Sequence, residues 1–250
     1  MLYVQAPFAK DLMNTRLAPG LFITGTDTGV GKTHVAAAIA RALVAEGSRV
    51  GVYKPTASGC TQGADGNLIS DDARMLWEAA GRHGEFERVC PQRFAAPLAP
   101  HLAAKAEGRE IDKQLLVDGL LYWDERSDLI LVEGAGGLFS PISDTQLNID
   151  LAREIGFPIV IVAPNRLGTI HGALSTVIAI DARGGEVTIG TVVLNEATAD
   201  PSDLSRASNF GEIRRLLCGY TSRPLTQLAY GSETFLHPID WQACAMNIEW

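Results

Sequence analysis

Short apolar runs alternate with longer stretches in which apolar residues recur every three or four positions. The runs contain mostly Val, Ile and Leu and show little apolar–polar alternation, which is typical of parallel strands buried on both faces. We therefore predict strands at LFIT (21–24), RVGVYK (49–54), DLILVE (128–133), PIVIVA (158–163) and VTIGTVVLN (187–195).

The stretches between these runs have the period of amphipathic helices. After the first run, Val35, Ile39 and Leu43 recur every four positions, and Gly47 ends the pattern. Strands that alternate with helices predict a single doubly wound α/β domain over 20–250, with a mostly parallel sheet and helices on both faces. Residues 1–19 are expected to be a loosely ordered extension, and the weak patterns from Leu225 onward predict no element. Helices are expected at 32–46, 72–81, 112–123, 147–156, 171–183 and 209–218.

Composition and charge narrow the class of protein. The chain has 250 residues, with 21 Lys and Arg against 29 Asp and Glu, so its formal net charge is −8. An acidic chain without a basic cluster is a poor candidate for binding nucleic acid or anionic lipid, and no apolar run reaches membrane-spanning length. The absence of a signal-like start and the four scattered cysteines predict a cytoplasmic protein with reduced thiols.

The segment GTDTGVGKT (25–33) follows the first predicted strand and opens the first helix. Backbone N–H groups at a helix start bind phosphate, and Gly29 and Gly31 allow the close approach of an anion. Lys32 is placed to reach the β- and γ-phosphates of a nucleotide, and the Thr33 hydroxyl to bind Mg²⁺. The strand, the glycines and the Lys-Thr pair at the helix start favour a nucleotide site over a plain turn. The spacing between the glycines is one residue longer than in the common phosphate loop, which indicates a particular kind of nucleotide site.

Acidic and basic residues follow other predicted strands. Glu133 ends DLILVE, where a carboxylate is the usual second anchor for Mg²⁺. Asp71 and Asp72 precede a predicted helix, and spacing alone favours an N-terminal cap for them. Lys54 ends the second predicted strand. A lone lysine is more often solvated at the surface. However, Lys54 and Lys32 would lie at the same edge of the sheet, and two cations there suit a multiply anionic substrate.

Several motifs occur together in one order. They are GTDTGVGKT (25–33), YKPTASG (53–59), APLAPHLAAKAEGREI (96–111), LILVEGAGGLFSPISD (129–144) and NRLGTIHGALST (165–176). In this order they resemble the dethiobiotin synthetase family over about residues 20–200. That family has a P-loop NTPase-type fold and a phosphate loop with five residues between its glycines, as here.

The resemblance implies an ATP-dependent cyclo-ligase that is homodimeric and uses Mg²⁺. Its substrates are 7,8-diaminononanoate, CO₂ and ATP. A carbamate of the diamine attacks the γ-phosphate, and the second amine then closes the cyclic urea of dethiobiotin. Positioning and cations would do most of this work, because a carbamate and a triphosphate lie side by side.

The resemblance also assigns roles by motif. Lys54 and Lys32 are the catalytic lysines, with Lys54 stabilising the carbamate and its phosphorylated form. Asp72 is chosen over Asp71 as a metal-side acid because it directly precedes the predicted helix. Implied metal ligands are Thr33, Asp72 and Glu133. Implied substrate contacts are Thr28 and Ser58. Implied ATP contacts are Gly29, Val30, Gly31, Lys32, Thr33, Asp72, Glu133, Gly134, Ala135, Gly136, Asn195, Ala229 and Tyr230, of which Asn195 would read adenine.

Two departures and three alternatives accompany this assignment. Ile170-His171-Gly172 stands where the family commonly has Ile-Asn-His, and LAYG (228–231) stands for the late nucleotide loop. A partition-type ATPase would carry its signature lysine where this chain has Asp27. An amide-forming ligase of related fold would need a further glutamine-hydrolysing domain. A family member that binds nucleotide without catalysis would not need Lys32, Thr33, Lys54 and Glu133 together.

Overall fold

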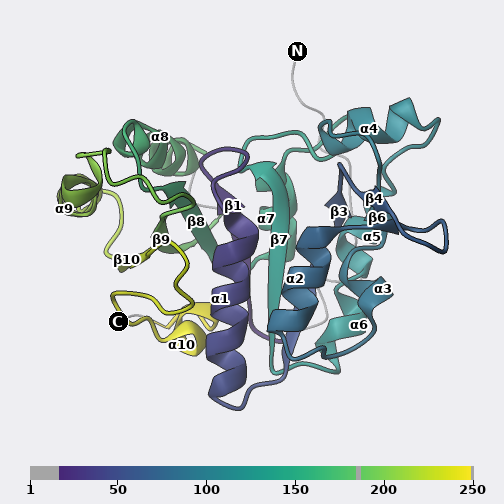
Figure 1. The fold of residues 1–250 in the computed structure, drawn as a ribbon. Coiled ribbons are helices and arrows are strands. Elements are labelled where there is room, and N and C mark those ends of the chain that lie inside the picture. The colour runs from purple at the N-terminus through teal and green to yellow at the C-terminus, as the bar shows by residue number, and fades with distance from the viewer. Residues whose placement is uncertain (1–16, 184–186, 249–250) are drawn as a thin grey trace.

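The computed structural model describes residues 17–183 and 187–248, which are built around a six-stranded parallel sheet (Figure 1). The strand order is β10-β9-β8-β1-β7-β2. The strands are β1 (Gly20–Gly25), β2 (Val50–Tyr53), β7 (Leu129–Gly137), β8 (Ile159–Pro164), β9 (Ile189–Asn195) and β10 (Leu225–Leu228). Each predicted apolar run forms a strand, and the predicted doubly wound α/β class is confirmed.

The first strand lies at the centre of the sheet. In register, Phe22 of β1 faces Val132 of β7 on one side and Ile159 of β8 on the other. All residues of β1 are buried, as expected for a strand covered by helices on both faces. Because all strands run parallel, their carboxyl ends meet at one edge, where open α/β sheets bind ligands.

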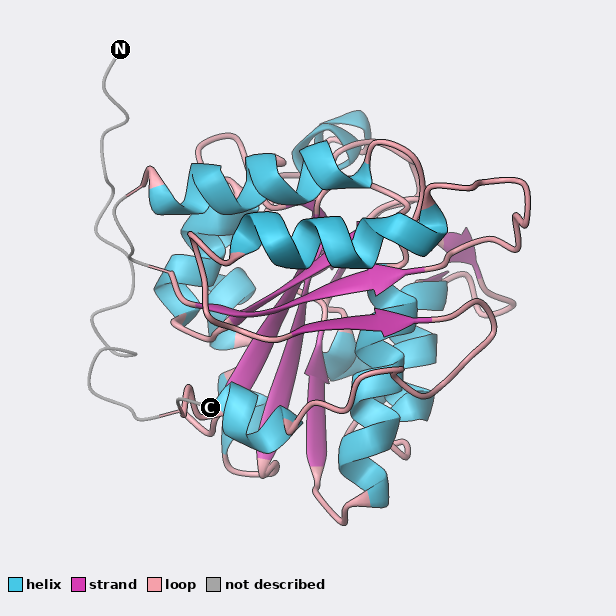
Figure 2. Ribbon diagram, turned by 90° about the vertical axis from the view of Figure 1, so that its left-hand side faces the viewer, coloured by secondary structure: helices cyan, strands magenta, loops and turns pink. Residues whose placement is uncertain are grey.

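Helices pack on both sides of the sheet (Figure 2), and α1 and α2 lie against each other on its front face in Figure 1. The helices of the main layers are α1 (Lys32–Ala45), α2 (Asp71–Ala79), α5 (Lys113–Asp118), α6 (Leu121–Asp124), α7 (Asn148–Ile155), α8 (Thr169–Asp181) and α9 (Arg206–Leu217). In the part of the chain that is described, no helix is long and apolar enough to cross a membrane.

The predicted helix over 112–123 is wrong in one respect, because the structure divides it into α5 and α6. At the break, a Cβ atom on Gly119 would lie only 2.2 Å from the Tyr53 hydroxyl oxygen. That hydroxyl donates a hydrogen bond of 2.5 Å to the carbonyl of Leu115. The buried tyrosine of β2 therefore occupies the space beside the break, a long-range contact that helical periodicity does not contain.

The region from Leu225 onward contains two elements that the sequence pattern did not predict. β10 extends the sheet beside β9, and α10 (Trp241–Ala245) follows it. α10 begins at an Asp240 cap that accepts a hydrogen bond of 2.8 Å from the N–H of Ala243. Both elements have five residues or fewer, too short for a period to appear.

Small elements surround the carboxyl end of β2. They are the pair β3 (Thr56–Ala57) and β6 (Gln92–Arg93), the hairpin β4 (Thr61–Gln62) and β5 (Leu68–Ile69), and the helices α3 (Phe86–Val89) and α4 (Pro100–Ala106). Of the predicted extension, residues 1–16 lie outside the described residues. Ala18 is fixed to the body by a 2.6 Å hydrogen bond from its N–H to Asp124.

Candidate active site

The loop over 25–33 leaves the carboxyl end of β1 and turns directly into α1. Gly29 and Gly31 have φ angles of 73° and 87°, the left-handed region that favours glycine. Gly31 is also the cap of α1, so the backbone N–H groups that follow it start the helix unpaired. This is the geometry expected for an anion site at a helix N-terminus.

Lys32 is the first residue of α1 and is largely buried, at 8% exposure. Its Nζ atom lies 3.4 Å from the carbonyl of Asp27 within the same loop. Burial lowers the pKa of Lys32, against the opposing effect of the nearby Glu133 charge. The ammonium group is therefore held under the loop, where an anion would compensate for its lost hydration.

A cluster of charged side chains joins three elements beside this loop. Thr33 of α1 donates a 3.0 Å hydrogen bond through Oγ1 to Oε1 of Glu133 on β7. Lys54, which follows β2, forms a hydrogen-bonded ion pair with the same Glu133 oxygen and lies 3.0 Å from Oδ2 of Asp72 on α2. The parallel sheet therefore brings together four of the residues that the resemblance selected.

Burial makes this cluster unlike a surface ion pair. Lys54 and Glu133 have exposures of only 4% and 1%. Burial would lower the pKa of Lys54, but the charges of Glu133 and Asp72 outweigh it and raise the pKa above its ordinary value. Lys54 is thus a buried cation, and the solvated-surface interpretation that a lone lysine favours is wrong.

The structure distinguishes the two aspartates, though not for the reason the sequence suggested. Asp71 and Asp72 both lie within the first turn of α2, whose cap is Ser70, so neither precedes the helix. Both aspartates are exposed, but the Asp72 carboxylate contacts the buried Lys54. Burial would raise the pKa of Asp72, but the Lys54 charge and hydrogen bonds from Lys54 and Thr33 lower it, so its carboxylate is ionised.

The oxygen atoms of this cluster fit a hard divalent cation. Oε2 of Glu133 is buried and has no hydrogen-bond partner in the described residues, and such an orphaned acceptor is costly unless a ligand satisfies it. A hydroxyl and two carboxylates are ligands that Mg²⁺ accepts together with phosphate oxygens. The donor set of Thr33, Asp72 and Glu133 is therefore suited to Mg²⁺.

The segment GAGG after Glu133 is held by a residue that sequence reasoning missed. Asn148, fully buried at the start of α7, accepts a 3.1 Å hydrogen bond from the N–H of Ala135 and donates one of 3.0 Å to the carbonyl of Gly137. A Cβ on Gly134 would lie 2.9 Å from Oδ1 of Asn148, and Gly136 has a φ of 78°. No local motif marks Asn148, which lies in the predicted helix over 147–156.

The two residues proposed as substrate contacts stand at the rim of the same end of the sheet. Thr28 is exposed, and its Oγ1 lies 3.6 Å from the position that a Cβ on Gly136 would occupy. Ser58 is half-buried in the segment between β3 and β4. The neighbouring Gly59 donates a 3.1 Å hydrogen bond to the carbonyl of Ala96, which links YKPTASG to the 96–111 motif.

Asn195 ends β9 directly beside the phosphate loop. Its Nδ2 donates a 2.9 Å hydrogen bond to the carbonyl of Val30, while its buried Oδ1 has no hydrogen-bond partner among the described residues. The approach is so close that a Cβ on Gly31 would lie 2.1 Å from Nδ2. Because the amide nitrogen of Asn195 already donates to Val30, Oδ1 is the atom of this side chain that could accept a hydrogen bond from a ligand.

The late segment LAYG lies next to Asn195. The N–H of Glu196 donates a 2.9 Å hydrogen bond to the carbonyl of Leu228. This bond holds the backbone directly before Ala229 and Tyr230 against the end of β9. Ala229 is half-buried and Tyr230 is 58% exposed. β10, which the sequence pattern did not predict, is the element that brings this segment to the site.

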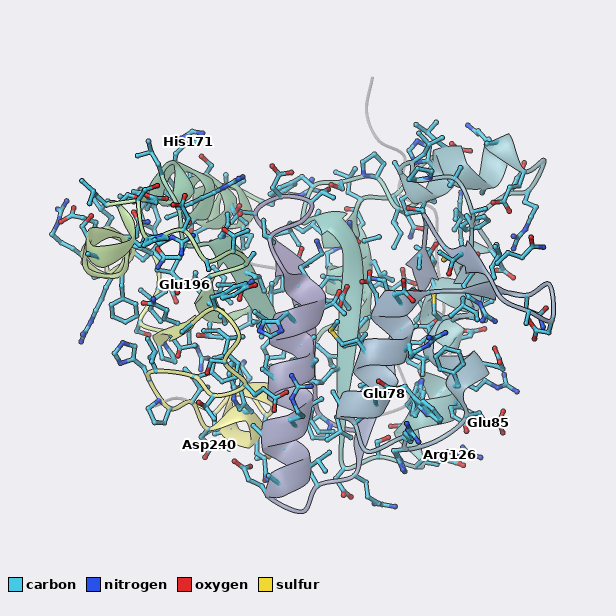
Figure 3. The ribbon with its side chains drawn as sticks, in the orientation of Figure 1. Glu78, Glu85, Arg126, His171, Glu196 and Asp240 are labelled. Atoms are coloured by element: carbon cyan, nitrogen blue, oxygen red, sulfur yellow. The ribbon has the colours of Figure 1, made fainter. Side chains whose placement is uncertain are left out.

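The altered loop after β8 begins α8 beside the phosphate loop. Its Gly172 packs on Thr26, because a Cβ at Gly172 would lie 3.5 Å from that of Thr26. His171, labelled on α8 in Figure 3, is exposed. The glycine thus stands at the contact between α8 and the 25–33 loop, and the histidine faces outward.

A parallel α/β sheet whose central strand ends in this loop, beside a Lys–Glu–Asp–Thr cluster built on the buried Lys54–Glu133 pair, defines a nucleotide-binding protein of the P-loop class. A family model described as an AAA domain matches residues 19–226. The ATP-dependent dethiobiotin synthetase BioD of Rhodopirellula baltica is 46% identical over 208 residues, or 79% of this chain and 80% of the relative. The chain therefore belongs to the family of ATP-dependent dethiobiotin synthetases.

Other relatives carry the same name. That of Anaeromyxobacter dehalogenans strain 2CP-C is 43% identical over 79% of this chain and 85% of its own length. That of Caulobacter strain K31 is 37% identical over 91% of this chain and 92% of its own length. The resemblance drawn from the motifs is thus confirmed as membership of the family, which neither the partition-type ATPase nor the amide-forming ligase predicts.

Proposed function

We propose that this chain is an ATP-dependent dethiobiotin synthase that acts on 7,8-diaminononanoate and CO₂. The observation that carries the proposal is the buried Lys54–Glu133 ion pair, with Asp72 and Thr33 in contact with it, beside the phosphate loop. A reaction that brings a carbamate against a triphosphate needs cations and polar groups fixed in advance. This cluster supplies them, and the family relatives supply the class of substrate.

The proposed reaction forms three bonds in sequence, a C–N bond, an O–P bond and a second C–N bond. One amine of the diamine adds to CO₂ and loses a proton, which gives a carbamate. A carbamate oxygen attacks the γ-phosphorus of ATP, the bond to ADP breaks, and a carbamic–phosphoric anhydride forms. The second amine then attacks the carbamate carbon, releases inorganic phosphate and closes the cyclic urea with loss of a second proton.

The chain's lysines have separate roles in this proposal. Lys32 and the backbone N–H groups at the start of α1 bind the β- and γ-phosphates. Lys54 neutralises the carbamate and the charge that develops as the phosphoryl group moves. Because its ammonium group is held by carboxylates inside the protein, little reorganisation is needed at the moment of reaction.

Thr33, Asp72 and Glu133 would hold Mg²⁺ in the loaded enzyme. The ion would supply charge neutralisation between the phosphates. The carboxylates also keep Lys54 protonated, because their charges raise its pKa. This double use explains why two acids lie beside one buried lysine.

The remaining contacts follow the walls of the site. Thr28, Ser58 and the 134–136 backbone are proposed to line the diamine and carbamate. Asn195 is proposed to face adenine with its Oδ1, which no described residue hydrogen-bonds and which suits the N6 amino group. Ala229 and Tyr230 are proposed to border the base. A homodimer stays a prediction, for which molar mass by light scattering is the measurement.

The test is phosphate release from purified protein with Mg-ATP and bicarbonate, with and without 7,8-diaminononanoate, while dethiobiotin is followed by mass. We expect phosphate release that depends on the diamine and matches product one to one. Diamine-independent hydrolysis, or tight ATP binding without product, would overturn the proposed activity and leave a nucleotide site with another substrate.

A further inference from the structure

A second polar cluster lies at the β9–β10 side of the site, around Glu196 (Figure 3). Oε1 of Glu196 accepts hydrogen bonds of 3.1 Å from Nδ2 of Asn165 and 3.0 Å from Nε2 of Gln227. Oε2 accepts one of 3.3 Å from the backbone N–H of Tyr230. One carboxylate thus joins the end of β8, β10 and the late segment.

The neighbours of this carboxylate are themselves fixed. Oδ1 of Asn165 accepts a 2.9 Å hydrogen bond from Nδ2 of Asn209 on α9, and both side chains are 2% exposed. The N–H of Asn165 donates a 2.7 Å hydrogen bond to the carbonyl of Asn195. Because the Asn165 oxygen is already engaged, its amide nitrogen must point at Glu196.

We infer that Glu196 is the positioning residue for nucleotide recognition in this chain, an inference that rests on the proposed adenine site. Glu196 follows Asn195 in sequence and holds Tyr230 through a backbone hydrogen bond. It fixes the spacing between the side chain that faces the base and the segment that borders it. The residue acts through these neighbours and does not itself bind the nucleotide.

The cluster requires an acceptor on both oxygens of residue 196. In the described structure, the three groups that hydrogen-bond to the Glu196 carboxylate are all N–H donors. In Glu196→Gln, one acceptor becomes an NH₂ group of nearly the same size, so a donor faces a donor whichever way the amide turns. Reorienting the Asn165 amide would forfeit its bond from Asn209. The substitution therefore loosens the late segment without removing volume.

The experiment compares Glu196→Gln with the unmodified chain in two assays. Calorimetric titration with Mg-ATP is expected to show an affinity lower by about tenfold, the size of a lost hydrogen bond to a charged group. Steady-state kinetics are expected to show the same rise in KM for ATP, with kcat within about twofold and KM for the diamine unchanged. Discrimination between ATP and GTP is expected to narrow.

The matched control is Glu212→Gln on α9, whose carboxylate pairs with Arg215 at 2.7 Å on the surface, and it is expected to bind ATP normally. An unchanged ATP affinity in Glu196→Gln, a loss confined to kcat, or an equal loss in the control overturns the inference. If Glu196→Gln does not fold, Gln227→Met removes one donor and is expected to weaken ATP binding about threefold. An unchanged affinity in that variant overturns it equally.

The binding assay separates this inference from the proposed activity. If the unmodified chain binds ATP but makes no dethiobiotin, the synthase proposal fails and the role of Glu196 is still decided by calorimetry. If dethiobiotin forms and Glu196→Gln binds ATP normally, only the positioning role fails.

Discussion

Two ion pairs tie the same two strands, β2 and β7, at opposite ends of the sheet. At the amino ends, Arg49 and Asp128 meet at 2.7 Å, with side-chain exposures of 60% and 49%. At the carboxyl end of the β2–β7 pairing, Lys54 and Glu133 meet with side-chain exposures of 5% and 1%. Charge and strand pairing are alike at both ends, and burial is the difference.

We infer from this difference in burial that the exposed pair has a structural role and that the buried pair has a role in the proposed chemistry. An exposed pair contributes little stability, because water screens it. A buried pair loses hydration that its Coulomb attraction only partly restores, so stability alone is a weak reason to keep one. Within the described parts of the chain, the Lys54–Glu133 pair also leaves Oε2 of Glu133 without a hydrogen-bond partner, which a stabilising pair would not do. The orphaned oxygen of the buried pair is the feature on which the proposed Mg²⁺ site depends.

The largest effect is expected for Lys54→Gln. Turnover should fall by about 10² or more, because a cation opposite the developing charge is lost, while ATP affinity stays nearly unchanged. The rate of dethiobiotin formation measures turnover, and calorimetric titration with ATP measures affinity. The matched variant at the exposed end, Arg49→Gln, should keep full turnover. An equal loss of ATP affinity in Lys54→Gln would remove its proposed role.

Thr33→Val tests whether Thr33 is a ligand of the proposed Mg²⁺ ion. The hydroxyl that donates to Glu133 is lost with almost no change in volume. We expect the Mg²⁺ concentration for half-maximal activity to rise by about tenfold, since one ligand is removed. Thr198→Val, on an exposed residue before α9, is the control. An unchanged Mg²⁺ dependence would exclude Thr33 from the metal shell.

Asn195→Ala tests the neutral side of the site. The variant loses the acceptor proposed for adenine and the hydrogen bond to Val30. We expect KM for ATP to rise by about five- to tenfold, a smaller effect than that of Lys54→Gln, because neutral hydrogen bonds contribute less than a charge. KM for the diamine should not change. Titration with ATP and GTP measures the effect, and equal losses of both substrates would contradict it.

The smallest effect is expected for Asp128→Asn at the exposed end. Hydrogen bonds from Arg49 lower the pKa of Asp128 to about 2. A depressed pKa contributes stability above the unfolded value near 4, and that contribution is lost as the pH falls toward 2. We expect a Tm about 1–2 °C lower at pH 7, a difference that narrows below pH 4. A difference that grew in acid would contradict this account.

Much of the fold followed from local pattern. Runs such as PIVIVA predict buried strands because every side chain is apolar, and β8 occupies that run. The 25–33 loop was found for a similar reason, since strand, glycines and helix start are all contiguous in sequence. The sequence pattern missed β10 and α10 because neither has a hydrophobic period of its own. β10 is held by its pairing with β9, and α10 by its contacts with β1, β9 and α1.

The site divided in the same way. Sequence marked Lys54 and Glu133 by their places at strand ends, and the family motifs selected Asp72. Sequence gave no signal for Asn148, which holds the GAGG backbone, or for Glu196, whose partners lie on other elements. Such roles depend on hydrogen bonds between residues far apart in the chain.

The sequence by itself determined the alternating elements, the phosphate loop and the family, because each depends on residues close together or on motifs in a fixed order. The tertiary structure alone decided that Lys54 is a buried cation rather than a solvated lysine, and that Asp72 rather than Asp71 reaches it. The reason is physical: hydrophobic period and glycine spacing act locally, whereas burial and charge pairing arise only when a parallel sheet brings separate strand ends to one edge.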